Sequence, residues 1–426
     1  MSSSENVFAE VIEVAKFIDE FRGHYFALPS YQEKIDLLKD QIEHALEKLD
    51  AIPIEKRESQ DEAAMYLYLR GKLLDVSPAY NQEAERLLTD AVKLNSSVVD
   101  AWICLGTCVW KRGDLDKAKS CFNSGLEQDP NNKQLLLQLS VLERRQCIGE
   151  TEVENPVEII NDCIKHVKEA ITLDIQDGIS WYILGNACLT AYFVTGCWDI
   201  NMLLQSLKAY KNALKDERMK LSSHMCYNCA MTYKYFEDYE TALSGFEAAE
   251  LLDPDLNGLE QAFNLYEILE GINSFLQDLN GSPTSSLPTV ESLASSLASV
   301  DLNPTYEKAT VNRLIEGPNL SKAVTGKVLF SVKNPSEIPI YYVVCDSDRT
   351  CFVITVYGVR STAIKEEDQV TLLDPFYHIF DFESRGKHYQ FKSLRIDFME
   401  QLRVNGAIVS PEHVIHRSMY PQLKEA

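Results

Sequence analysis

One helical unit recurs along this chain with a period of about 34 residues, and this repeat constrains the fold more than any other feature. Its first half is a Trp, a Leu and a Gly at fixed spacing, and it occurs at Trp102, Leu105 and Gly106 and again at Trp181, Leu184 and Gly185. Its second half is an Ala, an aromatic residue and a Pro, and it occurs at Ala118, Phe122 and Pro130 and again at Ala242, Phe246 and Pro254. A helix pair of this size cannot bury its own apolar face, so neighbouring pairs must stack. The stack leaves a curved groove, and such grooves bind partners.

This spacing is typical of the tetratricopeptide repeat, and it predicts about five repeats. We expect them at residues 64–98, 99–132, 133–177, 178–222 and 223–256. Apolar residues at helical spacing also predict two capping helices, over 5–27 and 31–50, and a closing helix after Asn257. We expect Gly106 to lie where two helices nearly touch, because glycine has no side chain.

Beyond Thr310 the apolar period changes from helical to strand-like. The runs expected to form strands are 328–332, 338–344, 351–357, 370–373 and 388–396. They are typical of a small Greek-key barrel of the oligonucleotide/oligosaccharide-binding (OB) kind. The predicted fold is therefore α+β and multidomain, an all-α tetratricopeptide-repeat solenoid followed by a five-stranded β-barrel (OB-fold). The expected domains are N-terminal capping helices at 1–55, the solenoid at 56–277, a linker at 278–305 and the barrel at 306–426.

The net charge of −23 is unevenly distributed along the chain. Residues 325–426 hold 12 Lys and Arg against 13 Asp and Glu, whereas residues 1–324 hold 29 against 51. An acidic solenoid disfavours binding to a phosphate backbone, while the near-neutral barrel leaves nucleic-acid binding open.

The sequence gives little support for chemistry or for membrane binding. Most of the 11 cysteines lie in the helical repeats and are expected to be reduced core thiols. Cys226 and Cys229 form a CxxC, but a structural zinc site needs a second ligand pair, so we expect no metal and no cofactor. Motifs of phosphate-binding loops and of nucleophilic hydrolases are lacking, which predicts no enzyme. Without a signal peptide or a membrane-length apolar run, we expect no membrane partner and a cytoplasmic or nuclear location.

Polar residues on the first helix of each repeat face the groove and are candidate peptide contacts. Asn186 and Asn228 lie on such helices and could bracket a peptide main chain, because a carboxamide both donates and accepts hydrogen bonds. Arg144, on the first helix of the third repeat, could pair with a carboxylate. The alternatives are that the amides are solvated or cap a loop, and that Arg144 is a surface residue like Arg145.

In the barrel, Lys387, Lys392 and Arg395 are the candidates for contact with nucleic acid. Aromatic residues such as Tyr341 and Phe352 could stack on bases, or could fill the barrel interior instead. A protein-binding barrel is the alternative.

The stretch from Asp177 to Asn186, the repeats, the Ser- and Pro-containing linker and the terminal barrel together resemble the family of tetratricopeptide repeat protein five. Its members are also called Strap, for stress-responsive activator of an acetyltransferase co-activator. The resemblance covers nearly the whole chain and implies an adaptor with two settings. In the nucleus such proteins are scaffolds for transcriptional co-activators in the stress and DNA-damage response. In the cytoplasm they recognise the Met-Arg-Glu start of nascent tubulin on the ribosome and recruit machinery that degrades tubulin mRNA.

The resemblance also implies roles for particular residues. Arg144 aligns with the arginine that contacts the Glu of the peptide. The aspartate that contacts the Arg of the peptide aligns with His224, a departure that puts this contact in doubt or moves it to nearby Glu237 or Asp238. The family's lysine-rich patch after the last repeat helix, suited to ribosomal RNA, falls on 277–285, which holds no Lys or Arg. Lys387 and Lys392 of the barrel would be the substitute ribosome contacts.

The leading hypothesis is a non-enzymatic adaptor whose groove binds the nascent tubulin peptide and acts with an mRNA-decay adaptor in tubulin autoregulation. One alternative is a nuclear scaffold for an acetyltransferase co-activator complex. A second alternative is a carboxylate-clamp co-chaperone, in which Arg144 and Lys234 would supply the basic residues.

Overall fold

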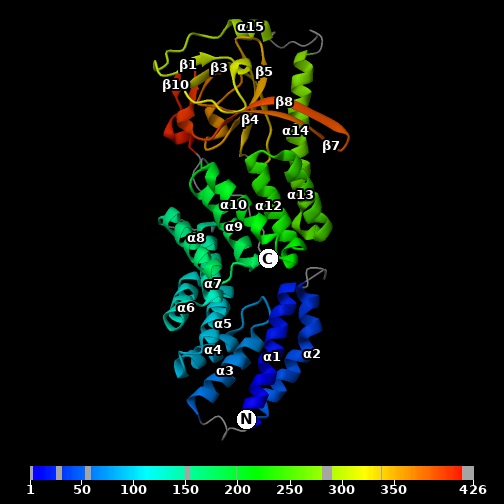
Figure 1. Cartoon of the computed structure of the whole chain (residues 1–426), viewed down its shortest axis with the longest axis vertical. Coiled ribbons are helices and arrows are strands. Elements are labelled where there is room, and N and C mark those ends of the chain that lie inside the picture. The colour runs from blue at the N-terminus through cyan, green and yellow to red at the C-terminus, as the bar shows by residue number, and fades with distance from the viewer. Residues whose placement is uncertain are drawn as a thin grey trace. The chain divides into compact units, whose positions relative to one another are not determined.

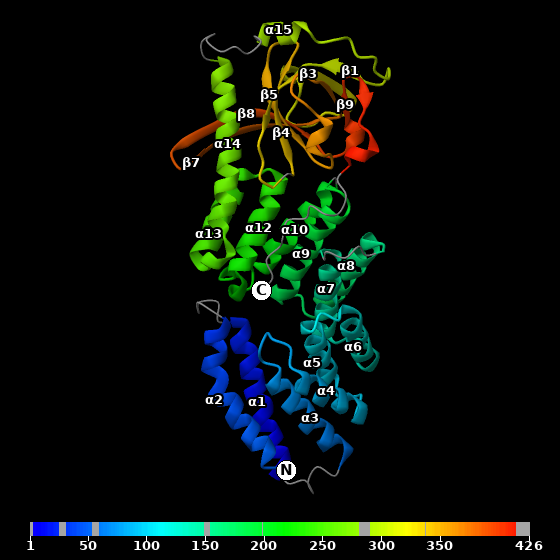
Figure 2. The same cartoon turned by 180° about the vertical axis from the view of Figure 1, so that it is seen from behind.

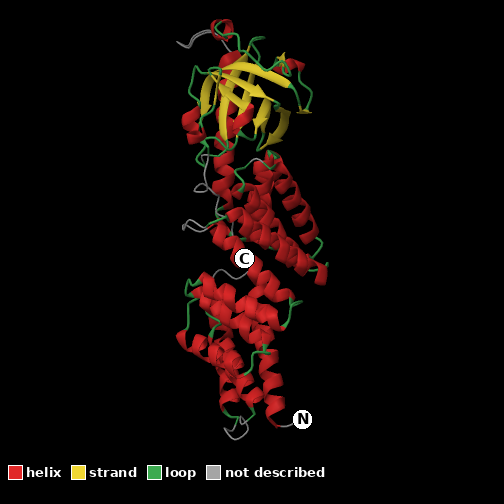
Figure 3. Ribbon diagram, turned by 90° about the vertical axis from the view of Figure 1, so that its left-hand side faces the viewer, coloured by secondary structure: helices red, strands yellow, loops and turns green. Residues whose placement is uncertain are grey.

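The structure is a computed structural model that describes residues 3–24, 31–52, 59–148, 154–197, 199–280, 290–336 and 338–414. Helices come first along the chain and a curled sheet follows (Figures 1 and 2). In Figure 3 the strands gather in the C-terminal part of the chain. The expected linker lies partly outside the described residues, because 281–289 are not among them.

The helices follow one another as antiparallel pairs, as the repeat period predicts. They are α1 (Ser3–His24), α2 (Tyr31–Asp50), α3 (Gln60–Leu74), α4 (Gln82–Leu94), α5 (Val99–Lys111), α6 (Leu115–Gln128), α7 (Lys133–Ile148), α8 (Pro156–Leu173), α9 (Gly178–Val194), α10 (Ile200–Ala213), α11 (Glu217–Lys220), α12 (Ser223–Phe236), α13 (Tyr239–Leu252), α14 (Gly258–Asn280) and α15 (Val290–Ser295). The first helices of the five repeats are thus α3, α5, α7, α9 and α12.

Each tryptophan of the repeat signature ties its helix to the loop before it. The indole N–H of Trp102 donates to the carbonyl of Ser96 at 2.9 Å, and that of Trp181 donates to the carbonyl of Ile175 at 2.9 Å. In both cases the acceptor lies six residues earlier. The same residues at the same spacing therefore form the same local geometry in two repeats. This is why the sequence pattern predicts the repeats.

Each glycine of the signature lies where the two helices of a repeat approach most closely. A Cβ on Gly106 would lie 2.3 Å from Cε1 of Phe122, and a Cβ on Gly185 would lie 2.4 Å from Cε1 of Tyr210. Both aromatic side chains are fully buried. The expectation for Gly106 is confirmed, because any side chain there would overlap the ring that fills the repeat.

The C-terminal strands form one curled mixed sheet. They are β1 (Glu307–Ala309), β2 (Gly317–Pro318), β3 (Lys322–Val332), β4 (Ile340–Asp346), β5 (Cys351–Val356), β6 (Gln369–Leu373), β7 (Phe376–Ser384), β8 (Lys387–Ile396), β9 (Leu402–Val404) and β10 (Ala407–Ile408). Their order is β10-β9-β6-β3-β4-β5-β8-β7-β2, with β1 beside β3. The β1–β3 and β5–β8 pairs are parallel, and the others are antiparallel.

The five predicted strands correspond to β3, β4, β5, β6 and β8, but the described residues form a sheet of ten strands rather than five. The largest strand that the sequence pattern missed is β7. Its residues carry aromatic side chains at both odd and even positions, so the apolar period of a strand is blurred. Phe376–Ser384 forms a strand because it pairs with β8 along its whole length.

The chain divides into two compact units, one of Met1–Ala187 with Lys208–Met225 and the other of Cys188–Leu207 with Cys226–Ala426. In the first unit the core is built from repeat residues such as Leu88, Leu105 and Phe122. In the second unit the last repeat helices and the sheet share one core, which includes Phe246, Leu269, Tyr341, Val353 and Phe391. This shared core crosses the boundary expected between solenoid and barrel.

Arg395 of β8 is a polar centre within that shared core. It is 3% exposed, and its guanidinium donates to the backbone carbonyl of Tyr235 (2.7 Å), to the hydroxyl of Tyr192 (3.1 Å) and to the carboxylate of Asp397 (2.7 Å). It also lies over the ring of Tyr357, 4.0 Å from the centroid. A buried cation is tolerated only where such contacts replace its water.

Glu237, in the turn between α12 and α13, completes this centre. Its carboxyl lies 3.5 Å from the Arg395 guanidinium and accepts the Tyr357 hydroxyl at 3.1 Å. Burial raises the pKa of Glu237 to about 7, against the opposing effects of Arg395 and Tyr357. The polar contacts thus join helices α9 and α12 to strand β8 inside one unit.

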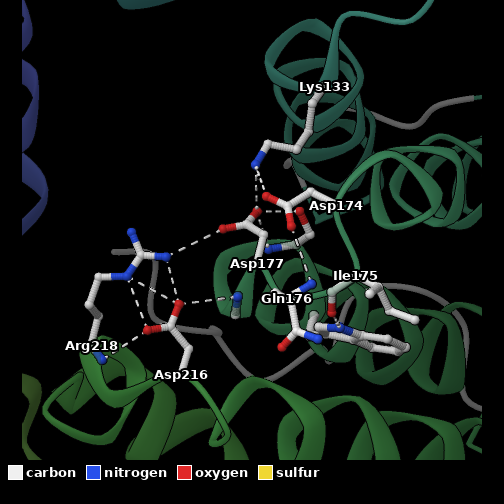
Figure 4. A network of polar contacts seen from close by, with 10 residues as sticks. Lys133, Asp174, Ile175, Gln176, Asp177, Asp216 and Arg218 are labelled. Carbon is white, nitrogen blue, oxygen red and sulfur yellow. Dashed lines mark hydrogen bonds and ion pairs between the residues drawn. The ribbon is translucent and has the colours of Figure 1, made fainter.

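In the first unit, a polar network fixes the start of α9 (Figure 4). Asp177 lies 3.6 Å from Lys133 and 3.6 Å from Arg218, and it accepts hydrogen bonds from the backbone and hydroxyl of Ser180. Asp216 pairs with Arg218 at 2.6 Å and accepts the backbone N–H of Gly178 at 3.3 Å. The hydrogen bond from Arg218 lowers the pKa of Asp216 to about 2.

We expect Gly106→Ala to destabilise the first unit by about 1 to 3 kcal/mol, because the new methyl group overlaps the Phe122 ring. Adding Phe122→Leu should recover part of the loss, since the shorter side chain makes room at the contact. Urea unfolding of the single and double variants, followed by circular dichroism, measures both effects. A Gly106→Ala protein as stable as the wild type would contradict the close approach.

We expect Asp216→Asn to destabilise the protein at pH 6 and to do so progressively less as the pH falls from about 4 to about 2. The folded-state pKa of Asp216 lies below its ordinary value, so its stabilising contribution is present above that ordinary value and is lost as the carboxylate takes up a proton. Urea unfolding of both proteins across this pH range tests the expectation. In an Arg218→Met background the difference should be much smaller, and an undiminished difference there would contradict the assignment to this ion pair.

Candidate peptide-binding site

The candidate peptide contacts lie on the first helices of the third, fourth and fifth repeats. Arg144 is on α7, Asn186 is on α9, and His224 and Asn228 are on α12. Arg144, Asn186 and His224 belong to the first compact unit, and Asn228 belongs to the second.

Arg144 is buried, whereas its neighbour Arg145 is exposed. The exposed fraction of Arg144 is 2%. The preceding residue, Glu143, is also buried, and its carboxylate pairs with Lys119 (3.0 Å) and with His166 (2.8 Å). Of these two arginines, Arg144 is therefore the one that faces the interior of the first unit. Arg144 is not the surface residue of the alternative interpretation.

The two amides are buried as well, so neither is simply solvated. Asn186 is 3% exposed, and its side-chain oxygen accepts the hydroxyl of Tyr210 at 2.7 Å. This hydrogen bond fixes the orientation of the carboxamide. Asn228 has no exposed surface, and its backbone carbonyl accepts the hydroxyl of Thr232 at 3.0 Å. His224, the second residue of α12, is partly exposed.

The two acids that could replace the family's aspartate are engaged inside the second unit. Glu237 pairs with Arg395, as described above. Asp238 caps α13, since its side chain accepts the backbone N–H of Thr241 at 3.1 Å. Both carboxyl groups therefore have structural roles, and His224 is left as the candidate for the second contact.

Lys234 is also unsuited to the role that a carboxylate clamp would require. Its side chain is fully buried, and its ammonium group donates to the hydroxyl of Ser336 at 3.3 Å, beside strand β4. Burial lowers the pKa of Lys234 to about 8. A lysine enclosed in this way does not present a charge to a ligand.

The three basic candidates of the sheet differ in their positions. Lys387 is exposed and pairs with Glu270 of α14 at 2.6 Å. Lys392 donates to the side-chain oxygen of Asn312 at 2.6 Å. Arg395 lies in the interior, so the structure does not present its guanidinium to a nucleic acid. Lys392 and Arg395 are three residues apart on β8. Because the side chains of a strand alternate between its two faces, these two side chains lie on opposite faces of β8.

Most sheet aromatics fill the interior rather than offering a stacking surface. Buried members are Tyr341, Tyr342, Phe352, Tyr377, Tyr389 and Phe391. Phe376 is exposed over 38% of its surface, and Phe330 and Phe382 are half-buried. Base stacking on this sheet therefore has little support from the geometry.

Sequence reasoning missed a cavity of about 370 Å³ on the inner helices of the first unit. It is lined by residues of α1, α3, α5 and α7, among them Lys72, Ile103, Thr107, Gln134 and Gln138. Gln134 and Gln138 are one helical turn apart on α7, the helix that carries Arg144. Two polar residues one turn apart on the first helix of a repeat were the sequence feature that could have predicted this cavity.

The described residues give little support for a metal site or for redox-active cysteines. All 11 cysteines are free, and burial raises the pKa of Cys163 and of Cys229 to about 12, which keeps both thiols protonated. Among the residues that the structure describes, no three His, Cys, Asp or Glu side chains are grouped to hold a metal ion. Within the same ranges, no helix is both long enough and apolar enough to cross a membrane.

Two solved structures resemble part of this chain. The structure titled as YrrB, a TPR protein with an unusual peptide-binding site, is 19% identical and covers 51% of this chain and 98% of its own, with a TM-score of 0.38. The Cut9-Hcn1 structure is 16% identical and covers 62% of this chain and 48% of its own, with a TM-score of 0.40.

Comparison with known sequences identifies the family. Residues 305–418 match the model described as the Tetratricopeptide repeat protein 5 OB fold domain. Tetratricopeptide repeat protein 5 of Bos taurus is 32% identical over 430 residues, which cover 95% of each chain. The protein of the same name from Homo sapiens is 33% identical over 415 residues, which cover 92% of each chain. The repeat helices, the sheet that follows them and this likeness over nearly the whole length show that the chain belongs to the tetratricopeptide repeat protein 5 family, a family of repeat proteins typical of protein-interaction adaptors.

Proposed function

We propose that this chain is a non-enzymatic adaptor whose inner repeat surface binds the Met-Arg-Glu start of nascent tubulin. Membership of the family supports an adaptor in general. The observation that carries the proposal is the position of Arg144 on the first helix α7, which the family resemblance pairs with the glutamate-binding arginine. Because Arg144 is only 2% exposed, a peptide carboxylate would reach it only after neighbouring side chains move aside. A guanidinium in that setting is poorly hydrated, so a peptide carboxylate would meet a stronger attraction than at the open surface.

The inner-helix amide of the first unit, Asn186, would hold the main chain of the peptide. Asn186 is already oriented by Tyr210, so little side-chain entropy is lost when a ligand binds. Affinity for a ligand of so few residues should be modest, because little surface is buried.

His224 would receive the arginine at the second position of the peptide. A neutral imidazole nitrogen accepts one hydrogen bond from a guanidinium, whereas an aspartate accepts two and supplies an opposite charge. Selectivity for arginine at this position should therefore be weaker than selectivity for glutamate at the third position. This difference follows from the replacement of the family's aspartate.

This function would be carried out in the cytoplasm. To trigger decay of tubulin mRNA, the chain would also have to contact the ribosome and an mRNA-decay adaptor. Lys387 and Lys392 are the ribosome contacts that we propose. Each now has a polar partner, but an exposed ion pair such as Lys387–Glu270 stabilises a protein by only about 0 to 1 kcal/mol and is readily exchanged. Binding through them should weaken as the salt concentration rises.

The alternative within the family is a nuclear scaffold for an acetyltransferase co-activator complex. Deleting the sheet would be a poor test of that alternative, because the sheet shares its core with the last repeats. Substitutions on the surface separate the two functions more cleanly. A carboxylate-clamp co-chaperone is not proposed, because Lys234 is enclosed.

We expect a fluorescent Met-Arg-Glu-Ile peptide to bind the full chain in an anisotropy titration, and a Met-Glu-Arg-Ile peptide to bind much more weakly. Arg144→Gln should weaken binding by about 30-fold or more, as expected for loss of one partner of a buried charge pair. Arg145→Gln, the same change at the exposed neighbour, should leave binding unchanged.

Circular dichroism of both variants separates lost binding from lost folding. Equal affinity for the two peptides, or equal effects of the two substitutions, would overturn the proposed recognition of nascent tubulin. The co-activator scaffold would then be the function to test.

A further inference from the structure

Strand β7 is fully paired along one edge and only partly paired along the other. It pairs with β8 from Phe376 to Ser384, whereas β2 covers only Phe376 and Tyr377 on the opposite side. From Ile379 onward, the described residues supply no strand beside that second edge. Exposed strand edges are templates for pairing with another chain.

Two observations show which backbone groups of β7 point toward the open edge. The hairpin turn has two residues, Arg385 and Gly386, both with positive φ, so Ser384 and Lys387 close it as a hydrogen-bonded pair. At the other end, the carbonyl of Pro375 accepts the N–H of Asn319 on the β2 side, at 3.1 Å. Because backbone groups alternate along a strand, the N–H and C=O of Ile379, Asp381 and Glu383 point toward the open edge.

A cavity of about 450 Å³ lies beside this edge, within the second unit. Phe376, His378 and Phe380 of β7 form one wall, and Ile200 of α10 and the α12–α13 turn form the opposite wall. Phe376 and Ile379 are 38% and 43% exposed. A strand added to β7 would send alternate side chains into this cavity, because the faces of a strand alternate.

The charge around the cavity favours a basic occupant. Its lining carries the carboxyl groups of Glu237, Asp238, Glu240 and Asp381, against Arg395 and His378. Glu237 pairs with Arg395, Asp381 pairs with His388 at 2.7 Å and Asp238 caps α13, so Glu240 is the lining carboxylate whose charge a basic occupant would meet. Arg395 is already paired with Asp397 at 2.7 Å, and His378 is 2.8 Å from Glu316. Glu240 is exposed at the rim, so a lysine or arginine entering there would meet an opposite charge.

We propose that the open edge of β7, Ile379–Glu383, is a second docking site that binds an extended, basic segment of a partner protein as an added strand. The main chain of the partner would pair with Ile379, Asp381 and Glu383, and alternate apolar and basic side chains would enter the cavity. A second copy of this chain is disfavoured as the occupant. Two β7 edges would place Asp381 and Glu383 opposite like charges.

The test uses the full chain and a fluorescent peptide, Gly-Ser-Ile-Thr-Arg-Thr-Ile-Ser, which places Ile, Arg and Ile on one face of a strand. An anisotropy titration should show saturable binding below about 1 mM. Two N-methylated versions carry the methyl groups either on Ile, Arg and Ile or on the two Thr. An added strand uses the N–H groups of only one alternate set, so one version should lose at least about 10-fold in affinity while the other is little changed.

A charge variant tests the cavity itself. Glu240→Lys should weaken binding of this peptide by at least about 5-fold, whereas Glu267→Lys, the same change on an exposed position of α14 outside the cavity, should not. Circular dichroism checks that both variants are folded.

Four results would overturn the proposal: no binding up to about 1 mM, equal loss from both methylated peptides, equal effects of the two charge variants, or a dimer of the chain that the peptide disrupts. The last result, seen by sedimentation velocity, would identify a second copy as the occupant.

Discussion

The second compact unit depends on one buried cation, the guanidinium of Arg395. Removed from water, it requires several oxygen acceptors at once, and it finds them on α9, on α12 and beside β8. Removing one partner of such a group commonly costs about 3 to 5 kcal/mol, because a buried charge is left uncompensated. The acceptors come from helices and sheet together, so the last repeats and the strands must fold as one body around it.

This constraint explains why the helices and the sheet of the second unit share one core. Tyr341 and Phe391 of the sheet pack into the same core as Phe246 and Leu269 of the helices. Apolar burial supplies the bulk of the stabilisation, and the Arg395 contacts fix which helix meets which strand. The shared core also gives the β7 edge a firm wall, since Phe380 stacks on Tyr239 with ring centroids 5.0 Å apart.

The two proposed docking sites differ in the sign of their charge, so they would bind partners of different charge. The inner repeat surface of the first unit offers the buried arginine Arg144, which suits an acidic residue of a short peptide. The β7 edge of the second unit offers a carboxyl-lined cavity, which suits a basic strand.

The sequence by itself determined the repeats, the five main strands and the buried position of Gly106, because each rests on local spacing that only one geometry satisfies. The sequence hardly distinguished Arg144 from Arg145. It also grouped Arg395 with Lys387 and Lys392 as candidates for contact with nucleic acid, and it did not predict β7. Those features were decided by the tertiary structure alone. A charged side chain turns inward only where distant segments supply its partners, and the mixed polar and apolar residues of β7 form a strand because they pair with β8 along its whole length.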